Sequence, residues 1–158
     1  MSNLPWIEKY RPKSLDNVVS HQHIIKMFKK FVEARDMPHI VLAGPPGTGK
    51  TSAVRAMARD MFGPNFFDRR VLEMNASQDN GINAVRTTIK DFAAIAAREH
   101  TLPDGHVVPG FKLIIMDEAD CMTKEAQKAL RMTIEDTSKN TRFCFICNLH
   151  LKTSYKTS

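Results

Sequence analysis

The sequence predicts an α/β fold in which a parallel sheet is wound by strand–helix–strand units. Three observations support this. Apolar strand-like runs alternate with helix-forming runs, a glycine-rich loop joins the first strand to a helix, and a later apolar strand ends in two acids. Parallel strands need crossovers long enough to hold a helix, so this alternation is typical of a parallel sheet. A length of 158 residues is enough for one domain with a real core.

The elements are expected in a regular order. Strands are predicted at 39–43, 71–75, 112–117 and 143–147. Helices are predicted at 21–35, 51–61, 82–97 and 124–135. Gly63-Pro64 is a stop signal for the second helix. Segment 100–111 holds two prolines and two glycines, which predicts a loop or a ragged hairpin.

The loop at 44–51 reads Gly-Pro-Pro-Gly-Thr-Gly-Lys-Thr and matches the phosphate-binding pattern G-x-x-x-x-G-K-[ST]. Its glycines let backbone N–H groups point at phosphate oxygens, and the dipole of the following helix adds to the attraction. Lys50 supplies a positive charge for the β- and γ-phosphates, and Thr51 offers a hydroxyl to Mg²⁺. The predicted nucleotide-binding residues of this loop are Gly44, Pro45, Pro46, Gly47, Thr48, Gly49, Lys50, Thr51 and Ser52.

A second motif lies 66 residues after Thr51, at the end of the apolar run 112–117. Asp117 is placed to hold the Mg²⁺ of a nucleotide, and Glu118 is placed to orient or activate an attacking water. Acids also cap strands or start helices, so this motif gains its weight from the phosphate loop before it. The sequence contains no Asn-Lys-x-Asp guanine-binding motif, which favours ATP over GTP.

Composition narrows the classes further. The net charge of +6 suits a polyanionic partner, although ATP alone also requires positive charge. We expect neither a membrane-spanning nor a secreted protein, because there is no run of 18 apolar residues and no signal peptide. Cys144 and Cys147 are three apart in a strand and should face opposite sides as core residues, not as a metal or redox pair. His21 and His23 are expected on the surface of a helix start.

Several segments together resemble a small subunit of replication factor C, a sliding-clamp loader of the AAA+ class. The resemblance runs from residue 3 to residue 148. The segments that carry it are LPWIEKYRP (4–12), GPPGTGKTS (44–52), VLEMNAS (71–77), GINAVRTTIKDFA (81–93), KLIIMDEADCMTKEAQKALR (112–131) and TRFCFICN (141–148). It implies an AAA+ P-loop NTPase core with ATP and Mg²⁺ as cofactors.

The resemblance also implies roles for individual residues. Asn148 would be the sensor that helps Glu118 orient water against the γ-phosphate. Arg86 and Lys90 would contact the backbone of primer–template DNA. They share one helix face, and a solvated basic face is the alternative. The residues implied around the adenine are Tyr10, Arg11, Pro12, Val18 and Val19.

The resemblance stops at Asn148, which divides the chain into a partial AAA+ domain (1–148) and a non-matching tail (149–158). The family's fifth strand, helical lid and collar are not matched, so the fold is expected to be incomplete. In the family sheet order 5-1-4-3-2, the strand at 39–43 would then be an edge. Expected partners are the other subunits of a hetero-pentameric clamp loader, the sliding clamp and primer–template DNA, with no membrane.

Three functions remain open from the sequence. The first is the ATPase subunit of a clamp loader, in the nucleus if the source is eukaryotic and in the cytoplasm if it is archaeal. The second is a nucleotide-binding fragment with negligible catalysis, because an arginine finger supplies roughly 10³–10⁵ in rate and the matched residues provide neither that arginine nor a lid. The third is another AAA+ DNA machine, such as a branch-migration helicase.

Overall fold

The computed structural model describes residues 21–78 and 81–148. The implied adenine-contacting residues Tyr10, Arg11, Pro12, Val18 and Val19 lie outside these described residues, as does the tail 149–158. The elements, in chain order, are α2 (His21–Ala34), β1 (Ile40–Ala43), α3 (Lys50–Phe62), α4 (Phe67–Arg70), β2 (Val71–Asn75), α5 (Gly81–Ala94), β3 (His100–Thr101), β4 (Val107–Val108), β5 (Lys112–Asp117), the 3-10 turn η2 (Ala119–Cys121), α6 (Lys124–Thr137) and β6 (Thr141–Cys147).

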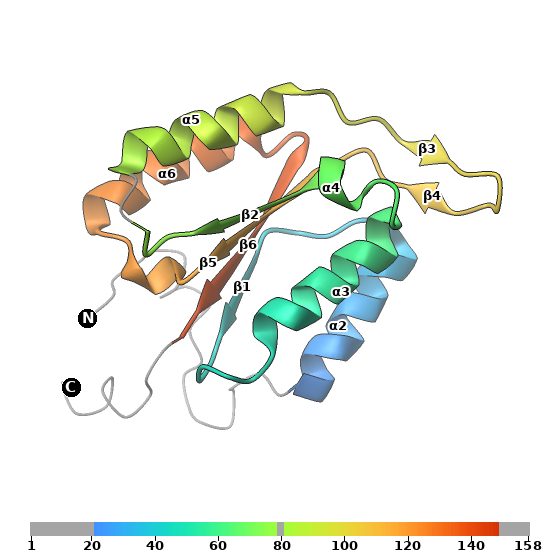
Figure 1. The fold of residues 1–158 in the computed structure, drawn as a ribbon, viewed down its shortest axis with the longest axis horizontal. Helices are drawn as coiled ribbons and strands as arrows, with labels where there is room; N and C mark the ends of the chain where they lie inside the picture. Colours follow the sequence, from blue (N-terminus) through green and yellow to red (C-terminus); the bar gives the residue numbers. More distant parts are fainter. Residues whose placement is uncertain (1–20, 79–80, 149–158) are drawn as a thin grey trace.

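The main sheet has four strands in the order β1-β6-β5-β2, and every pair is parallel. The parallel, βαβ-wound sheet predicted from the sequence is therefore confirmed. Within the described residues β1 pairs only with β6, so it lies at an edge, as expected. All the strands end on the same side of the sheet, which brings the loop after β1 close to the acids after β5 (Figure 1).

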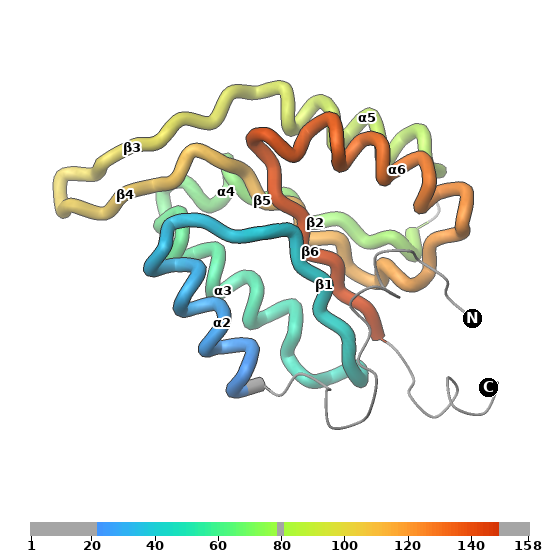
Figure 2. The backbone as a smooth tube through the Cα atoms, turned by 180° about the vertical axis from the view of Figure 1, so that it is seen from behind, coloured from blue at the N-terminus to red at the C-terminus, as the bar shows by residue number. Residues whose placement is uncertain are grey.

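Two helical layers cover the sheet, with α2 and α3 on one face and α5 and α6 on the other (Figures 1 and 2). Side chains of the central strands alternate between the two cores, because successive residues of a strand face opposite sides. Cys144 packs with the α2/α3 layer and Cys147 with the α5/α6 layer, and both are buried free thiols. The prediction that they are core residues is confirmed.

The short helix α4 and the turn η2 were not predicted, and segment 100–111 forms the ragged hairpin β3–β4. The helix predicted at 82–97 ends earlier, at Ala94. Its last carbonyls are taken by side chains from other elements. Lys112 Nζ donates to Phe92 O, and Asn140 Nδ2 donates to Ala93 O at 2.9 Å. These distant donors satisfy the helix end where the sequence offers no local stop signal.

Two strand boundaries also differ from the prediction. β1 begins at Ile40 rather than at 39, because His39 Nδ1 accepts a hydrogen bond from Phe143 N at 3.1 Å in place of a ladder carbonyl. β6 begins two residues earlier than expected, at Thr141, which pairs with Lys112. No helix in the described part of the chain combines the length and the apolar character needed to cross a membrane.

Candidate nucleotide site

The phosphate-binding loop is anchored to the centre of the sheet at its first residue. Gly44 N donates to Cys147 O, at the end of β6, over 3.2 Å. Gly47 and Gly49 have φ angles of 79° and 80°, in the left-handed region that favours glycine. Gly49 directly precedes α3, so the positive ends of the first N–H groups of this helix face the loop. The backbone of residues 44–51 thus has the cradle geometry expected of a phosphate-binding loop.

Lys50 lies inside this cradle and is only 6% exposed. Its Nζ donates to Gly44 O at 3.1 Å, to Pro45 O at 2.7 Å and to Thr48 Oγ1 at 3.2 Å. Burial lowers the pKa of Lys50, while the negative charge of Asp117 acts to raise it. The ammonium group is therefore held at the loop by carbonyls that phosphate oxygens can replace as partners.

The predicted metal ligands are in contact across the site. Thr51 Oγ1 donates to Asp117 Oδ2 at 3.1 Å, and Asp117 Oδ1 accepts from Glu118 N at 2.8 Å. The described residues hold no cluster of three or more His, Cys, Asp or Glu side chains that could bind a metal alone. A hydroxyl and one carboxylate fit Mg²⁺, which keeps several waters and takes further oxygens from nucleotide phosphates.

Glu118 has an unusual backbone conformation. Its φ of 52° and ψ of 41° lie in the left-handed region, and Glu118 and Arg35 are the non-glycine residues with positive φ in the described chain. Such a conformation costs about 1–3 kcal/mol in a non-glycine residue and is found at functional sites. It reverses the chain directly after β5, and Glu118 O accepts from Cys121 N to close the turn η2.

This turn brings Asp120 against the end of β6. Asp120 Oδ1 accepts a hydrogen bond from the backbone N–H of Asn148 at 3.4 Å. Asn148, the predicted sensor residue, is half-buried one residue after Cys147, whose carbonyl anchors the phosphate loop. The structure therefore brings together Lys50, Thr51, Asp117, Glu118 and Asn148.

Sequence reasoning did not identify Asp120 as a residue of the site. The signal was present as the last acid of the run Asp-Glu-Ala-Asp at 117–120, but only the left-handed turn at Glu118 shows that it reaches β6. Arg55 and Asn75 were also missed. Both line a cavity of about 430 Å³ beside Thr51 and Asp117. Arg55 forms an ion pair with Glu73 across this cavity.

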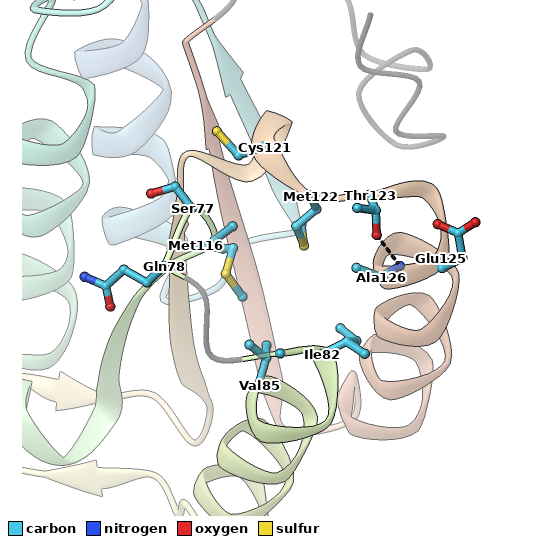
Figure 3. Close-up of a pocket in the computed structure, with 12 residues that line it drawn as sticks. Ser77, Gln78, Ile82, Val85, Met116, Cys121, Met122, Thr123, Glu125 and Ala126 are labelled. Carbon is cyan, nitrogen blue, oxygen red and sulfur yellow. Dashed lines mark hydrogen bonds between the residues drawn. The ribbon is translucent and has the colours of Figure 1, made fainter.

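The predicted DNA-contacting residues lie apart from the phosphate loop, on α5. Lys90 is exposed, whereas Arg86 is half-buried and its Nε donates to Thr133 Oγ1 of α6 at 3.4 Å. A cavity of about 540 Å³ lies at the N-terminal ends of α5 and α6, between the loop after β2 and the first turns of these two helices (Figure 3). Thr123 caps α6 there, and Glu125 lies on the rim.

The family comparison agrees with this geometry. The family model of the AAA ATPases (ATPase family associated with various cellular activities) matches residues 40–154. The chain therefore belongs to the AAA family of ATPases.

Within that family the chain is similar to replication factor C subunits. It is 51% identical over 147 residues to replication factor C subunit 4 of Arabidopsis thaliana, covering 93% of this chain and 43% of that protein. It is 50% identical over 145 residues to replication factor C subunit 4 of Homo sapiens, covering 92% of this chain and 40% of that protein. The archaeal replication factor C small subunit of Thermofilum pendens is 51% identical over 148 residues. The chain thus spans about two fifths of the length of these relatives.

Solved structures confirm the fold. A RuvB variant from Thermotoga maritima matches with a TM-score of 0.51 at 19% identity, covering 87% of this chain and 41% of that one. A DNA polymerase III gamma subunit-related protein from the same organism matches with a TM-score of 0.54 at 17% identity, covering 83% and 43%. At these identities the likeness shows the fold alone.

Proposed function

We propose that this chain is an ATP-binding subunit of a DNA sliding-clamp loader, in which ATP binding and hydrolysis drive the loading of a clamp onto primer–template DNA. The observation that carries the proposal is the hydrogen bond between Thr51 and Asp117, which brings the two proposed Mg²⁺ ligands together in a chain about half identical to replication factor C subunits. The other subunits of a hetero-pentamer, the clamp and the DNA are its proposed partners.

In this proposal the N–H groups of residues 44–50 and the Lys50 ammonium bind the β- and γ-phosphates of ATP. Thr51 and Asp117 hold Mg²⁺, which neutralises phosphate charge. The carboxylate of Glu118 orients the attacking water, and the Asn148 side chain holds that water against the γ-phosphate. The hydrogen bond from Asn148 N to Asp120 supports this role, because it ties the sensor to the turn that carries Glu118. Tyr10, Arg11, Pro12, Val18 and Val19 are proposed to surround the adenine.

DNA binding is proposed to involve the phosphate backbone, with Lys90 as an exposed contact and Arg86 beside it on α5. The hydrogen bond between Arg86 and Thr133 holds the guanidinium between α5 and α6, which leaves its remaining N–H groups to approach a phosphate. Residues 1–148 are proposed to form a partial AAA+ domain, followed by a tail at 149–158 of which the AAA family model still matches residues 149–154. The proposed location is the nucleus for a eukaryotic source and the cytoplasm for an archaeal one.

We also propose that the 158 residues tested alone bind ATP but turn it over negligibly. Of the residues that line the cavity beside Thr51 and Asp117, Arg55 is the only arginine, and it is paired with Glu73. A free guanidinium at the transferred phosphate contributes roughly 10³–10⁵ in rate, so a neighbouring subunit is needed to supply it.

The test is a steady-state ATPase assay with the chain alone and with the chain assembled with partner subunits, clamp and primed DNA. We expect binding of Mg-ATP in both cases and turnover stimulated by primed DNA only in the assembly. A chain that binds Mg-ATP but never enters a clamp-loading complex would refute the clamp-loader assignment. Full DNA-independent turnover by the chain alone would refute the second proposal.

A further inference from the structure

The histidine that precedes β1 lies where the strand that carries the phosphate loop joins the sheet. We propose that His39 is a proton-sensitive latch: its neutral imidazole holds the amino end of β1 against β6, and protonation releases that end. In the described part of the chain β1 pairs only with β6, so this edge strand is held from one side (Figure 1). His39 precedes β1 and the phosphate loop follows it, so the latch lies outside the nucleotide site. The inference therefore does not depend on the proposed function.

The geometry assigns one charge state to this ring. His39 Nδ1 accepts a hydrogen bond from Phe143 N at 3.1 Å. An imidazole nitrogen can accept only when it carries no proton, so the ring is neutral and its proton lies on Nε2. The ring also packs against the side chain of Phe143, with the two centroids 5.7 Å apart. This bond precedes the first paired residues of the β1–β6 ladder, which are Ile40 and Cys144.

The charged neighbours of His39 oppose its protonation. Burial lowers the pKa of His39, and the positive charge of Arg142 lowers it further. Arg142 is held beside the latch, because its Nε donates to Met37 O at 2.8 Å and its Nη1 donates to Ser138 O at 2.7 Å. Asp36 is the acid of this cluster, but its Oδ1 lies 3.7 Å from Arg142 Nη2 and accepts from Met37 N. Within residues 21–78 and 81–148 no carboxylate forms an ion pair with His39.

Protonation places two donors opposite each other. An imidazolium carries N–H groups at both nitrogens, so Nδ1–H then points at the N–H of Phe143, and a second positive charge lies beside Arg142. Keeping that charge half-buried without a carboxylate partner is costly, and the ring is better solvated in water. The first contact between β1 and β6 is then lost. The other end of the same four-residue strand is tied by the bond from Gly44 N to Cys147 O, so one of the two end contacts of β1 depends on a proton.

The direction of the pH effect follows from the two states of the chain. A histidine in an unfolded chain titrates at about pH 6.5, whereas His39 in the folded chain titrates at a lower pH. As the pH falls, the unfolded chain therefore binds the proton first. The latch stabilises the fold in full above pH 6.5, and this stabilisation is lost as the pH falls through the folded-state pKa.

The test compares the full chain with His39→Asn and His39→Ala in urea denaturation between pH 5 and pH 7.5. Asparagine Oδ1 can replace Nδ1 as the acceptor and does not titrate, so this variant keeps the bond at every pH. His100→Asn is the matched control, because it removes an exposed histidine elsewhere. Long-range proton–nitrogen NMR spectra of the parent chain, folded and in urea, report the tautomer and the pKa of His39 without requiring a variant that folds.

We expect the unfolding equilibrium constant of the parent, relative to that of His39→Asn, to rise at least about threefold from pH 7.5 to pH 5.5, with about tenfold per pH unit as the limiting slope. His100→Asn should keep the pH dependence of the parent. His39→Ala should lose it, and its unfolding constant at pH 7.5 should be about fivefold higher, because the N–H of Phe143 is left without its acceptor.

The spectra should show the neutral ring with its proton on Nε2 and a pKa lower in the folded chain than in urea. A proton on Nδ1, or the same pKa in the folded and unfolded chains, would overturn the proposal. The same pH dependence in the parent and in His39→Asn would also overturn it, as would an alanine variant as stable as the parent at pH 7.5. None of these readouts involves nucleotide, which keeps the outcome separate from that of the proposed function.

Discussion

Replacing Lys50 with methionine is expected to remove Mg-ATP binding while leaving the fold stable. The substitution keeps a flexible unbranched chain in the buried position and removes only the ammonium group. In the structure this group donates three hydrogen bonds within the loop, to Gly44 O, Pro45 O and Thr48 Oγ1. Phosphate oxygens are stronger acceptors than these neutral groups, because the bond then joins opposite charges.

The magnitude follows from the number of contacts. Two charge-assisted bonds to phosphate, each worth about 1.5–3 kcal/mol, give a loss of roughly 3–6 kcal/mol in binding free energy. That corresponds to a dissociation constant raised by about 10²–10⁴-fold. The effect on folding is smaller, because burial already penalises the charged form, as the lowered pKa of Lys50 shows. The substitution destabilises the fold by removing three hydrogen bonds, and it stabilises the fold by removing the cost of burying a charge. Because these two effects offset each other, the unfolding free energy should change by no more than about 1 kcal/mol.

The assay is isothermal titration calorimetry with Mg-ATP, paired with urea denaturation without nucleotide. Lys26→Met is the matched control, because Lys26 is an exposed lysine of α2 and loses the same charge. We expect the control to keep parental affinity. Parental affinity in Lys50→Met would refute the phosphate-site assignment. An equal loss in both variants would show that overall charge, rather than the position of the ammonium, determines binding.

Three further predictions follow from the same structure. Glu118→Gln should keep Mg-ATP binding and remove hydrolysis in the assembled complex, so an unchanged turnover number would exclude Glu118 as the water-orienting group. Replacing Arg86 and Lys90 with alanine should flatten the slope of log K for DNA against log salt by about two phosphate contacts, whereas equal slopes would leave the pair as a solvated face. Burial, with a contribution from Asp120, raises the pKa of Cys147 to about 12, and burial raises the pKa of Cys144 well above its usual range. Because these thiols ionise near pH 8.5 when unfolded, stability should be constant below that pH and fall above it by up to about 1.4 kcal/mol per pH unit per thiol; a flat profile in urea denaturation between pH 8 and 10 would contradict their burial.

The strands and long helices could be predicted because their signals are local. The run at 112–117 holds four consecutive apolar residues and folds as β5, an inner strand of the sheet that is buried along almost its whole length. The phosphate loop could be predicted equally well, because its function depends on glycines and a lysine at fixed spacing within residues 44–51. The Thr51–Asp117 contact then follows from the topology, since parallel strands end on the same side of the sheet.

The features that sequence reasoning missed depend on residues far apart in the chain. The end of α5 is fixed by Lys112 and Asn140, which lie 20 and 47 positions after the carbonyls they bind. The role of Asp120 depends on the left-handed turn at Glu118, a conformation that no pattern of side chains announces for a glutamate. The periodicity of apolar residues predicts which face of a helix or strand a residue occupies, but it does not identify the distant residue that the side chain contacts there.

The same limit explains why one helix serves different chemistry at its two ends. The sequence of α5 shows a single amphipathic segment with basic residues. In the structure its first turn faces the cavity of Figure 3, Arg86 in its middle leans on α6, and its last turn meets the buried cations Arg70 and Lys112. A surface cation and a buried one are identical letters in the sequence, yet the first is balanced by water and the second needs a partner. The distinction comes from the packing of α4 and β5 against the end of α5, which buries Arg70 and Lys112 while Lys90 stays exposed on the same helix's surface.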